Sequence, residues 1–277
     1  MGTLTIFSLT DHMYSPLKLA AKYFRYYLGA SSKKGHGTHS PFVFGFIKNV
    51  LNTTTSSAIT KPIENLRREL LNDRRSIDIQ DYGAGSVGGS KRTRSISSII
   101  KTSAKPPRYA QLLSRIVSYY KPINILELGT SMGITTSYLA LGNPEGRVIT
   151  IEGSSVIASK AVANFQQLEI TNVRVVPGIF EEVLDEVLKE MPFPDLVFID
   201  GNHRYQPTIN YFNQLLSHVR NDSILIFDDI HWSREMEEAW KTISSNPEVT
   251  CTIDLFFIGI VLFRQEFREK QHFCIRY

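Results

Sequence analysis

The sequence predicts an α/β fold, in which a mostly parallel sheet of seven strands carries helices on both faces and follows a helical extension. Beyond residue 108, short apolar runs alternate with segments whose apolar residues have helical spacing, the pattern of strands and crossover helices in a parallel sheet. The last two apolar runs are joined by only a few residues around 255–257, too few for a crossover helix. We therefore expect an antiparallel final hairpin.

The expected elements follow in chain order. The strands lie near residues 123–128, 147–152, 172–177, 194–200, 222–228, 249–254 and 258–264. The helices lie near 133–141, 154–168, 179–190, 204–219 and 231–244, and a helix over 108–120 leads into the sheet. Residues 106–277 would form this domain and residues 1–105 the extension, which serves as a lid, a substrate region or a dimer region.

Bulk composition indicates an ordinary soluble globular protein, because 42% of the 277 residues are hydrophobic and 21% are charged. No apolar run approaches the ~20 residues that span a bilayer. The N-terminus lacks the basic-then-apolar order of a signal peptide. Cys251 and Cys274 have no metal-type spacing, so we expect a reducing, cytoplasmic setting.

Charge is distributed unevenly along the chain. Residues 1–120 hold 18 basic and 6 acidic side chains, and residues 121–277 hold 13 and 21, so that net charges of +12 and −8 give the overall +4. A basic first part could steer an anionic substrate, nucleic acid or a membrane surface. Its basic residues are dispersed, which favours docking on the acidic second part or simple solvation.

Three helices are expected in the extension. The first covers residues 14–29, and its apolar face consists of Leu17, Ala20, Ala21, Phe24, Tyr27 and Leu28. We expect this face to pack on the following domain or on a twin subunit, as in a homodimer. The second begins at Ser40 as N-cap and Pro41 as first helical residue, and the third covers 62–74. The glycine-containing stretch Asp81–Ser86 is interpreted as a loop beside the site.

A strand, a tight turn and a helix start are predicted over residues 123–139. The apolar run ends in Glu127-Leu128-Gly129, continues through Thr130 and Ser131, and reaches Gly133 before helical spacing begins. Glycines suit a turn that brings bare backbone N–H groups and a helix N-terminus close to a ligand. The spacing E-x-G-x-x-x-G differs from the dinucleotide fingerprint G-x-G-x-x-G, and it favours S-adenosylmethionine over NAD.

The next strand ends in an acid, at Glu152-Gly153, 23 residues beyond Gly129. A carboxylate there can accept hydrogen bonds from both ribose hydroxyls of a nucleoside, although a lone Glu at a strand end can also be merely exposed. With the glycine turn, this motif resembles the class I S-adenosylmethionine-dependent methyltransferases, from about Pro106 to the C-terminus. The resemblance implies a Rossmann-like seven-stranded sheet.

The same resemblance implies how the cofactor is held. Glu127 and the turn from Gly129 to Gly133 would bind its methionine end, and Glu152 its ribose. The third strand ends at Pro177 without an Asp for the adenine amine, so backbone groups near Gly178 and Ile179 would contact the adenine.

Three carboxylates follow two apolar strands. Asp200 ends the run at 195–199, and Asp228 and Asp229 end the run at 223–227. Parallel strands direct their carboxyl ends to one edge, so these groups repel one another unless a cation or protons compensate. Oxygen ligands suit Mg²⁺. The alternative is that Asp228 and Asp229 cap the next helix.

This constellation resembles the cation-dependent O-methyltransferases of the catechol, caffeoyl-CoA and macrocin types, with Asp200, Asp228 and Asp229 at the metal-binding positions. The resemblance also makes Asp200 a catalytic and cofactor-contacting residue. Catechol-type enzymes have a Lys base three residues after the first Asp, whereas this chain has His203. At a helix start the dipole disfavours protonated His, and neutral imidazole is a competent base at pH 7. A capping or surface role is the alternative.

The sequence thus predicts methyl transfer from S-adenosylmethionine to a small-molecule hydroxyl, assisted by a divalent cation, with Asp200 and His203 as catalytic residues. Three alternatives stay open: a cation-independent N- or RNA methyltransferase, an NAD-type oxidoreductase, and a non-enzymatic cofactor-binding or assembly protein. Nucleic acid is the less favoured partner but is not excluded.

Overall fold

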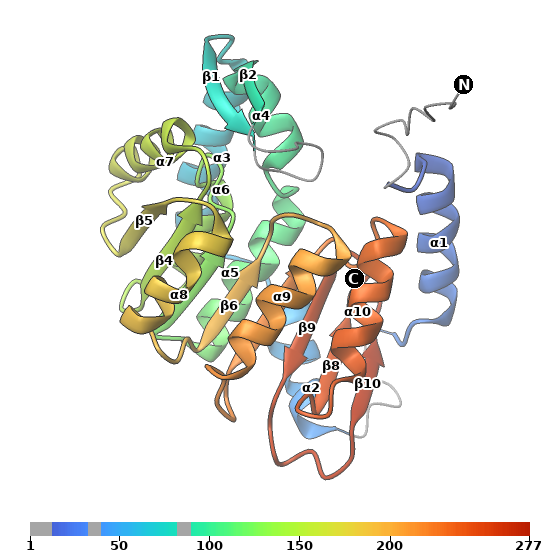
Figure 1. The fold of residues 1–277 in the computed structure, drawn as a ribbon. Helices are drawn as coiled ribbons and strands as arrows, with labels where there is room; N and C mark the ends of the chain where they lie inside the picture. The colour runs from blue at the N-terminus through green and yellow to red at the C-terminus, as the bar shows by residue number, and fades with distance from the viewer. Residues whose placement is uncertain (1–12, 33–39, 82–89) are drawn as a thin grey trace, which may run out of the picture.

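The computed structural model describes residues 13–32, 40–81 and 90–277. Its centre is an eight-stranded sheet in the order β10-β8-β9-β7-β6-β3-β4-β5 (Figure 1). The strands are β3 (Asn124–Leu128), β4 (Arg147–Glu152), β5 (Val173–Pro177), β6 (Leu196–Ile199), β7 (Ile224–Asp228), β8 (Cys251–Asp254), β9 (Ile258–Leu262) and β10 (Gln271–Cys274). Strands β3 to β7 pair parallel, and β9 pairs antiparallel with both β7 and β8. The predicted parallel sheet with an antiparallel final hairpin is confirmed.

Each face of the sheet carries its own layer of helices. One core joins inward residues such as Ile125 and Phe198 to α5 (Pro107–Tyr120), α6 (Ile134–Gly142) and α7 (Ser155–Gln167). The other joins their strand neighbours Leu126 and Val197 to α8 (Phe180–Glu190), α9 (Tyr205–Leu216) and α10 (Arg234–Ser245). Successive residues of one strand therefore enter opposite cores, as the two-residue period of a β-strand requires.

The structure adds elements that were not predicted. An eighth strand, β10, pairs parallel with β8 at the sheet edge, where seven strands were expected. An antiparallel hairpin of β1 (Ser76–Asp81) and β2 (Ser90–Ser95), followed by α4 (Ile96–Ser103), was not predicted either. Of the stretch interpreted as a loop, Asp81 is instead the last residue of β1, and residues 82–86 lie outside the described part of the chain.

Most of the extension shares its core with the sheet domain. Helix α2 (Pro41–Phe46) begins at Ser40, whose Oγ accepts a bond from the Val43 N–H, as predicted. It continues into the π-helix η1 (Ile47–Leu51), which packs with α5. Helices α3 (Ser57–Asn72) and α4 bury Ile63, Leu66, Ile99 and Ile100 against α6 and α7. The division at residue 105 therefore does not separate two cores.

Helix α1 (Pro16–Gly29) presents a different face from the one expected. Leu17, Phe24 and Leu28 are 86%, 64% and 63% exposed, so the predicted apolar face does not pack on the domain. Tyr23 and Tyr26 pack instead, with ring centroids 5.0 and 5.2 Å from that of Phe256. The Tyr26 hydroxyl also donates to the backbone carbonyl of Ile275. Tyrosine can bury its ring while its hydroxyl satisfies a carbonyl, which leucine cannot do.

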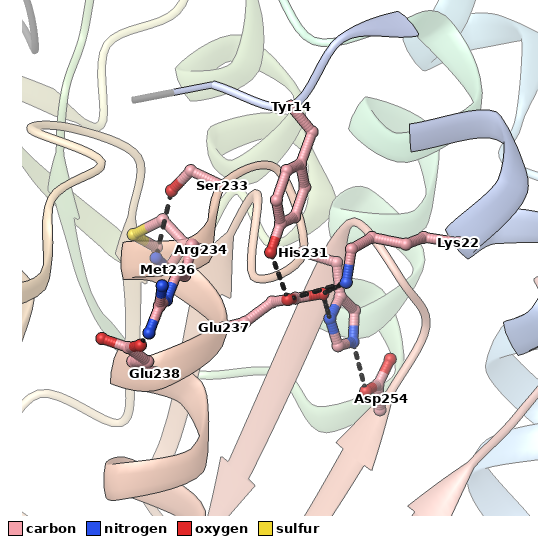
Figure 2. A network of polar contacts seen from close by, with 9 residues as sticks. All are labelled: Tyr14, Lys22, His231, Ser233, Arg234, Met236, Glu237, Glu238 and Asp254. Carbon is pink, nitrogen blue, oxygen red and sulfur yellow. Dashed lines mark hydrogen bonds and ion pairs between the residues drawn. The ribbon is translucent and has the colours of Figure 1, made fainter. Parts of the chain in front are cut away.

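Polar contacts hold the start of α1 against α10 (Figure 2). The Tyr14 hydroxyl donates to Glu237 Oε2 at 2.7 Å, and Lys22 Nζ lies 2.9 Å from both oxygens of that carboxylate. His231 lies between two acids, with Nδ1 3.2 Å from Glu237 Oε1 and Nε2 2.7 Å from Asp254 Oδ2. We call these five residues the α1 network.

Across the described ranges, no helix is long and apolar enough to cross a membrane.

Candidate functional site

A cavity of about 350 Å³ lies at the carboxyl ends of β3, β4, β6 and β7. Residues predicted to form the site line it: Gly129, Thr130, Ser131, Glu152, Gly153, Ile179, Asp200, His203 and Asp229. The extension forms another part of the lining, through Ile79, Arg94, Ile99, Ile100 and Lys105. The sheet edge and the extension therefore enclose one space together.

The turn after β3 needs glycine for steric reasons. Gly129 has φ +110°, and a Cβ added there would fall on the backbone carbonyl oxygen of Asp200. Gly133 has φ +78° and directly precedes α6. Only glycine adopts such angles without strain, so the turn keeps a bare backbone wall toward the cavity. Such a wall fits a ligand that approaches the main chain closely.

Glu152 stands at the end of β4 and faces this turn. Its Oε2 accepts a bond from the Ser131 N–H at 2.8 Å, and its Oε1 accepts one from the Ser154 N–H at 3.0 Å. Backbone donors thus fix the carboxylate in the wall of the cavity. A fixed carboxylate beside a bare glycine turn fits the ribose and methionine ends of a nucleoside sulfonium cofactor.

Glu127 lies beneath the turn and is not part of the cavity lining. Its side chain is completely buried, and Oε2 accepts bonds from Thr136 Oγ1 at 2.5 Å and Thr150 Oγ1 at 2.6 Å. Oε1 has no hydrogen-bond partner among residues that the structure describes. Burial raises the pKa of Glu127, and the two threonine bonds lower it by less, so that it lies at about 8. Its contact with the methionine end of the cofactor stays a prediction.

The predicted adenine side is partly in place. Ile179 lines the cavity, together with Phe180 of α8. Gly178 has φ +149°, and its N–H donates to the Glu152 carbonyl at 2.9 Å. This bond uses the backbone donor of Gly178, so an adenine contact there would have to use another group.

The three predicted carboxylates converge, and a lysine lies among them. Lys105 Nζ makes an ion pair with Asp228 Oδ2 and lies 3.7 Å from Asp200 Oδ1 and 3.8 Å from Asp229 Oδ1. Asp228 is 1% exposed, and its Oδ1 has no hydrogen-bond partner in the described residues. Burial raises the pKa of Asp200, although the charges of Lys105 and His203 pull it down.

The alternative that Asp228 and Asp229 cap the next helix is wrong. Helix α10 begins at Arg234, and Ser233 caps it by accepting a bond from the Met236 N–H at 3.1 Å. Asp229 instead has φ +53°, a left-handed angle that is uncommon outside glycine. Asp229 therefore lines the cavity, Asp228 pairs with Lys105, and neither caps α10.

The side chains gathered here are of the kinds that can bind a metal cation. Asp200, His203 and Asp228 each offer one ligand atom, and these atoms lie within 4.8 Å of one another. Carboxylates and an imidazole can together bind a divalent metal. This group contains His203 where the prediction has Asp229. The Lys105 ammonium, however, already contacts two of the three ligand residues.

His203 lies where the sequence predicts the base. It precedes α9, its Nε2 lies 3.5 Å from Asp200 Oδ1, and its side chain is 19% exposed. The ring meets that of Trp232 edge to face, with centroids 5.6 Å apart. The imidazole is thus oriented by an acid and an aromatic ring at the cavity wall. Its role as a base stays a prediction.

Lys105 is the residue that the sequence analysis missed. It belongs to the extension and stands 123 positions before Asp228 in the chain. The local sequence, Ser103-Ala104-Lys105-Pro106-Pro107, has the composition of an exposed linker. The only available signal was the need of three neighbouring carboxylates for a counter-charge, which does not say which residue supplies it.

Comparisons with known proteins agree with this geometry. Residues 126–230 match a family model described as a methyltransferase domain. A catechol O-methyltransferase from Niastella koreensis is 30% identical over 134 residues, which cover 47% of this chain and 58% of that relative. The chain thus spans little more than half the length of this relative.

Solved structures establish the fold. An O-methyltransferase from Bacillus cereus, solved in complex with SAH, aligns with a TM-score of 0.54 and 20% identity over 80% of this chain and 97% of its own. A putative caffeoyl-CoA O-methyltransferase from Staphylococcus aureus aligns with a TM-score of 0.51 and 18% identity, covering 60% and 88%. Residues 126–230 therefore match a methyltransferase domain, and the chain resembles the catechol and caffeoyl-CoA O-methyltransferases, as predicted.

Proposed function

We propose that this protein transfers the methyl group of S-adenosylmethionine to a hydroxyl oxygen of a small molecule. The observation that carries the proposal is a single cavity that joins the glycine turn and Glu152 to Asp200 and His203. A cofactor held at the first pair and an acceptor held at the second would meet inside it. Positioning of this kind supplies much of the rate of a displacement reaction.

Each end of the cavity would have its own task. Glu152 would accept hydrogen bonds from the cofactor ribose, and the turn from Gly129 to Gly133 would hold the methionine end. S-adenosylmethionine, when bound, supplies an electrophilic methyl group on a positively charged sulfur. His203 Nε2 would take the proton of the acceptor hydroxyl, and Asp200 would stabilise the imidazolium that forms.

The name of the Niastella relative suggests the acceptor class, a dihydroxyphenyl compound. The ring of His203, which lines the cavity and packs against Trp232, is compatible with a flat aromatic acceptor, because aromatic rings pack well against one another. Mg²⁺, the predicted ion, would require Lys105 to leave Asp228. The proposed reaction therefore does not depend on a divalent ion.

Calorimetric titration with S-adenosylmethionine tests the cofactor assignment. Glu152→Ala should weaken binding by roughly 1–3 kcal/mol, the scale of lost charge-assisted hydrogen bonds. Glu182→Ala is the matched control, because Glu182 is exposed on α8 and outside the cavity lining, and it should bind like the wild type. Equal affinity in both variants would refute the ribose contact, and NAD binding in place of S-adenosylmethionine would indicate an oxidoreductase.

The acceptor is tested with catechol and caffeic acid as probes and labelled S-adenosylmethionine as donor. Labelled O-methyl products identified by mass spectrometry are expected. Labelled tRNA, with no product from either phenol, would instead favour the alternative of an RNA methyltransferase.

A further inference from the structure

Lys105 reaches the carboxylates from a well-anchored segment. Helix α4, which precedes it, buries Ile96, Ile99 and Ile100. The Ser103 hydroxyl lies 2.6 Å from that of Ser131 in the glycine turn, and two prolines follow Lys105. Proline restricts both its own backbone and that of the preceding residue. The side chain is 11% exposed, so this lysine is not a freely moving surface residue.

The ammonium group of Lys105 contacts the carboxylate oxygens that a metal ion would need as ligands. Lys105 Nζ contacts Asp228 Oδ2 and lies 3.7 Å from Asp200 Oδ1, and both residues belong to the group Asp200–His203–Asp228 that could hold a metal ion. Two positive charges about 4 Å apart in a partly buried site repel each other strongly. Ammonium and divalent ion therefore exclude each other at this place.

We propose that Lys105 is the resident cation of this site and takes the place of a divalent metal ion. The ammonium neutralises Asp228 and its neighbours, so that the carboxylates take up no divalent ion while Lys105 is in position. Removing the ammonium exposes Asp228, whose Oδ1 is buried and has no partner among the described residues, and turns the cluster into a metal site.

The replacement of a metal ion by Lys105 also explains how the extension and the sheet domain form one site. The resident cation comes from the segment between α4 and α5, and its carboxylates come from β6 and β7. In the proposed methyl transfer, this charge would stabilise negative charge that develops on the acceptor oxygen. That catalytic consequence rests on the proposed function, whereas the binding claim does not.

Mn²⁺ binding to the full chain, followed by electron paramagnetic resonance and calorimetry, tests the proposal. The wild type should show no saturable binding at millimolar Mn²⁺. Lys105→Met should bind one Mn²⁺ per chain, tighter by roughly 100-fold or more. Lys105→Arg, which keeps the charge, should behave like the wild type. Lys101→Met removes an equal charge from the exposed side of α4 and should gain nothing.

Adding Asp228→Asn to Lys105→Met should abolish the new binding and so locate the ion. Saturable Mn²⁺ binding by the wild type would overturn the proposal, even if Lys105→Met fails to fold. A folded Lys105→Met variant without Mn²⁺ binding would also overturn it. Failure of the Glu152→Ala titration would refute the cofactor assignment and leave these results unaffected.

Discussion

Two groups of carboxylates in this molecule are built from the same kinds of residue. The cavity cluster combines Asp200, Asp228 and Asp229 with His203 and Lys105, and the α1 network combines Glu237 and Asp254 with His231, Tyr14 and Lys22. In both, acids of the second half of the chain bind a lysine of the first. These pairs support the interpretation that the basic first part docks on the acidic second part.

The two groups differ in how completely their oxygens are paired. In the α1 network, tyrosine, lysine and histidine pair both oxygens of Glu237. Asp254 pairs with His231 at 2.7 Å (Figure 2). It also accepts a bond from the Phe256 N–H at 2.8 Å. In the cavity cluster, Asp228 Oδ1 has no partner within the described part of the chain, and Lys105 is 3.7 Å or more from Asp200 and Asp229.

This difference suits the α1 network to holding α1 in place and the cavity cluster to binding a reacting group. A fully paired cluster has no free capacity for a ligand and holds α1 in place. A sparsely paired cluster at a cavity edge keeps capacity for a reacting group, at a cost in stability.

The two histidines give the largest expected contrast. His203→Ala should lower turnover by roughly 10²–10⁴-fold if His203 is the general base, with little change in melting temperature. His231→Ala should keep turnover and lower the melting temperature, because it leaves Asp254 and Glu237 without their shared donor. Initial rates and thermal unfolding of both variants provide the check, and a reversed pattern would break the comparison.

Neutralising Asp228 should destabilise the protein more than neutralising Glu237. Asp228→Asn leaves a largely buried ammonium with a neutral amide in place of its contacting carboxylate, and should cost roughly 3 kcal/mol of unfolding free energy. Glu237→Gln keeps neutral hydrogen bonds in a more exposed site and should cost about 1 kcal/mol. Urea unfolding of the wild type and both variants measures the difference. Equal losses would show that the cavity cluster is as tightly paired as the α1 network.

Glu127 should make the region beneath the cavity sensitive to pH. Its pKa of about 8 lies above the ordinary 4.5, so its neutral form contributes stability that is fully present below pH 4.5 and lost as pH rises to about 8. Glu127→Gln, which stays neutral, should lack this loss. Between pH 5 and 7 the wild type should lose roughly 2 kcal/mol relative to the variant in urea unfolding. Parallel pH profiles would mean that Glu127 is ionised in the fold.

His231 should give a smaller effect of the same sign at higher pH. Burial lowers its pKa, but the hydrogen bond and charge of Asp254, with those of Glu237, outweigh burial and raise it above 6.5. The contribution of charged His231 is therefore fully present below pH 6.5 and declines as pH rises through the raised pKa. Relative to His231→Gln, the wild type should lose stability over that window. A difference that stays constant from pH 6 to 9 would contradict it.

Strands β3, β6, β7 and β9 were predictable because each is a mostly buried apolar run bounded by polar or turn residues. Convergence of Asp200 with Asp228 followed from the rule that parallel strands share one carboxyl edge. Strand β2 was not predictable, because Ser-Lys-Arg-Thr-Arg-Ser has no apolar alternation. Strand β10 is short, half-exposed and attached only at the sheet edge.

Side-chain partners were the harder part of the site. Nothing local distinguishes Lys105 from Lys101, since only the packing of α4 brings the first to Asp228. The tyrosine contact of α1 with the domain was missed because apolar scales rank Leu17 and Phe24 above Tyr26, and packing of the predicted face on a twin subunit stays a prediction. Tyr26 packs on the domain instead, because its hydroxyl donates a hydrogen bond to the backbone carbonyl of Ile275. Such choices depend on tertiary neighbours that periodicity does not contain.

The contact between Gly129 and Asp200 limits how this site can be redesigned. There is no space for a side chain at residue 129, because any Cβ would displace the main chain that follows β6. The glycine turn and the first acid are therefore a single rigid unit, and a library that varies one without the other should yield mostly misfolded clones. An engineer who wants a wider acceptor space would do better to vary α4 and the segment that carries Lys105, where the opposite wall of the cavity is built from side chains.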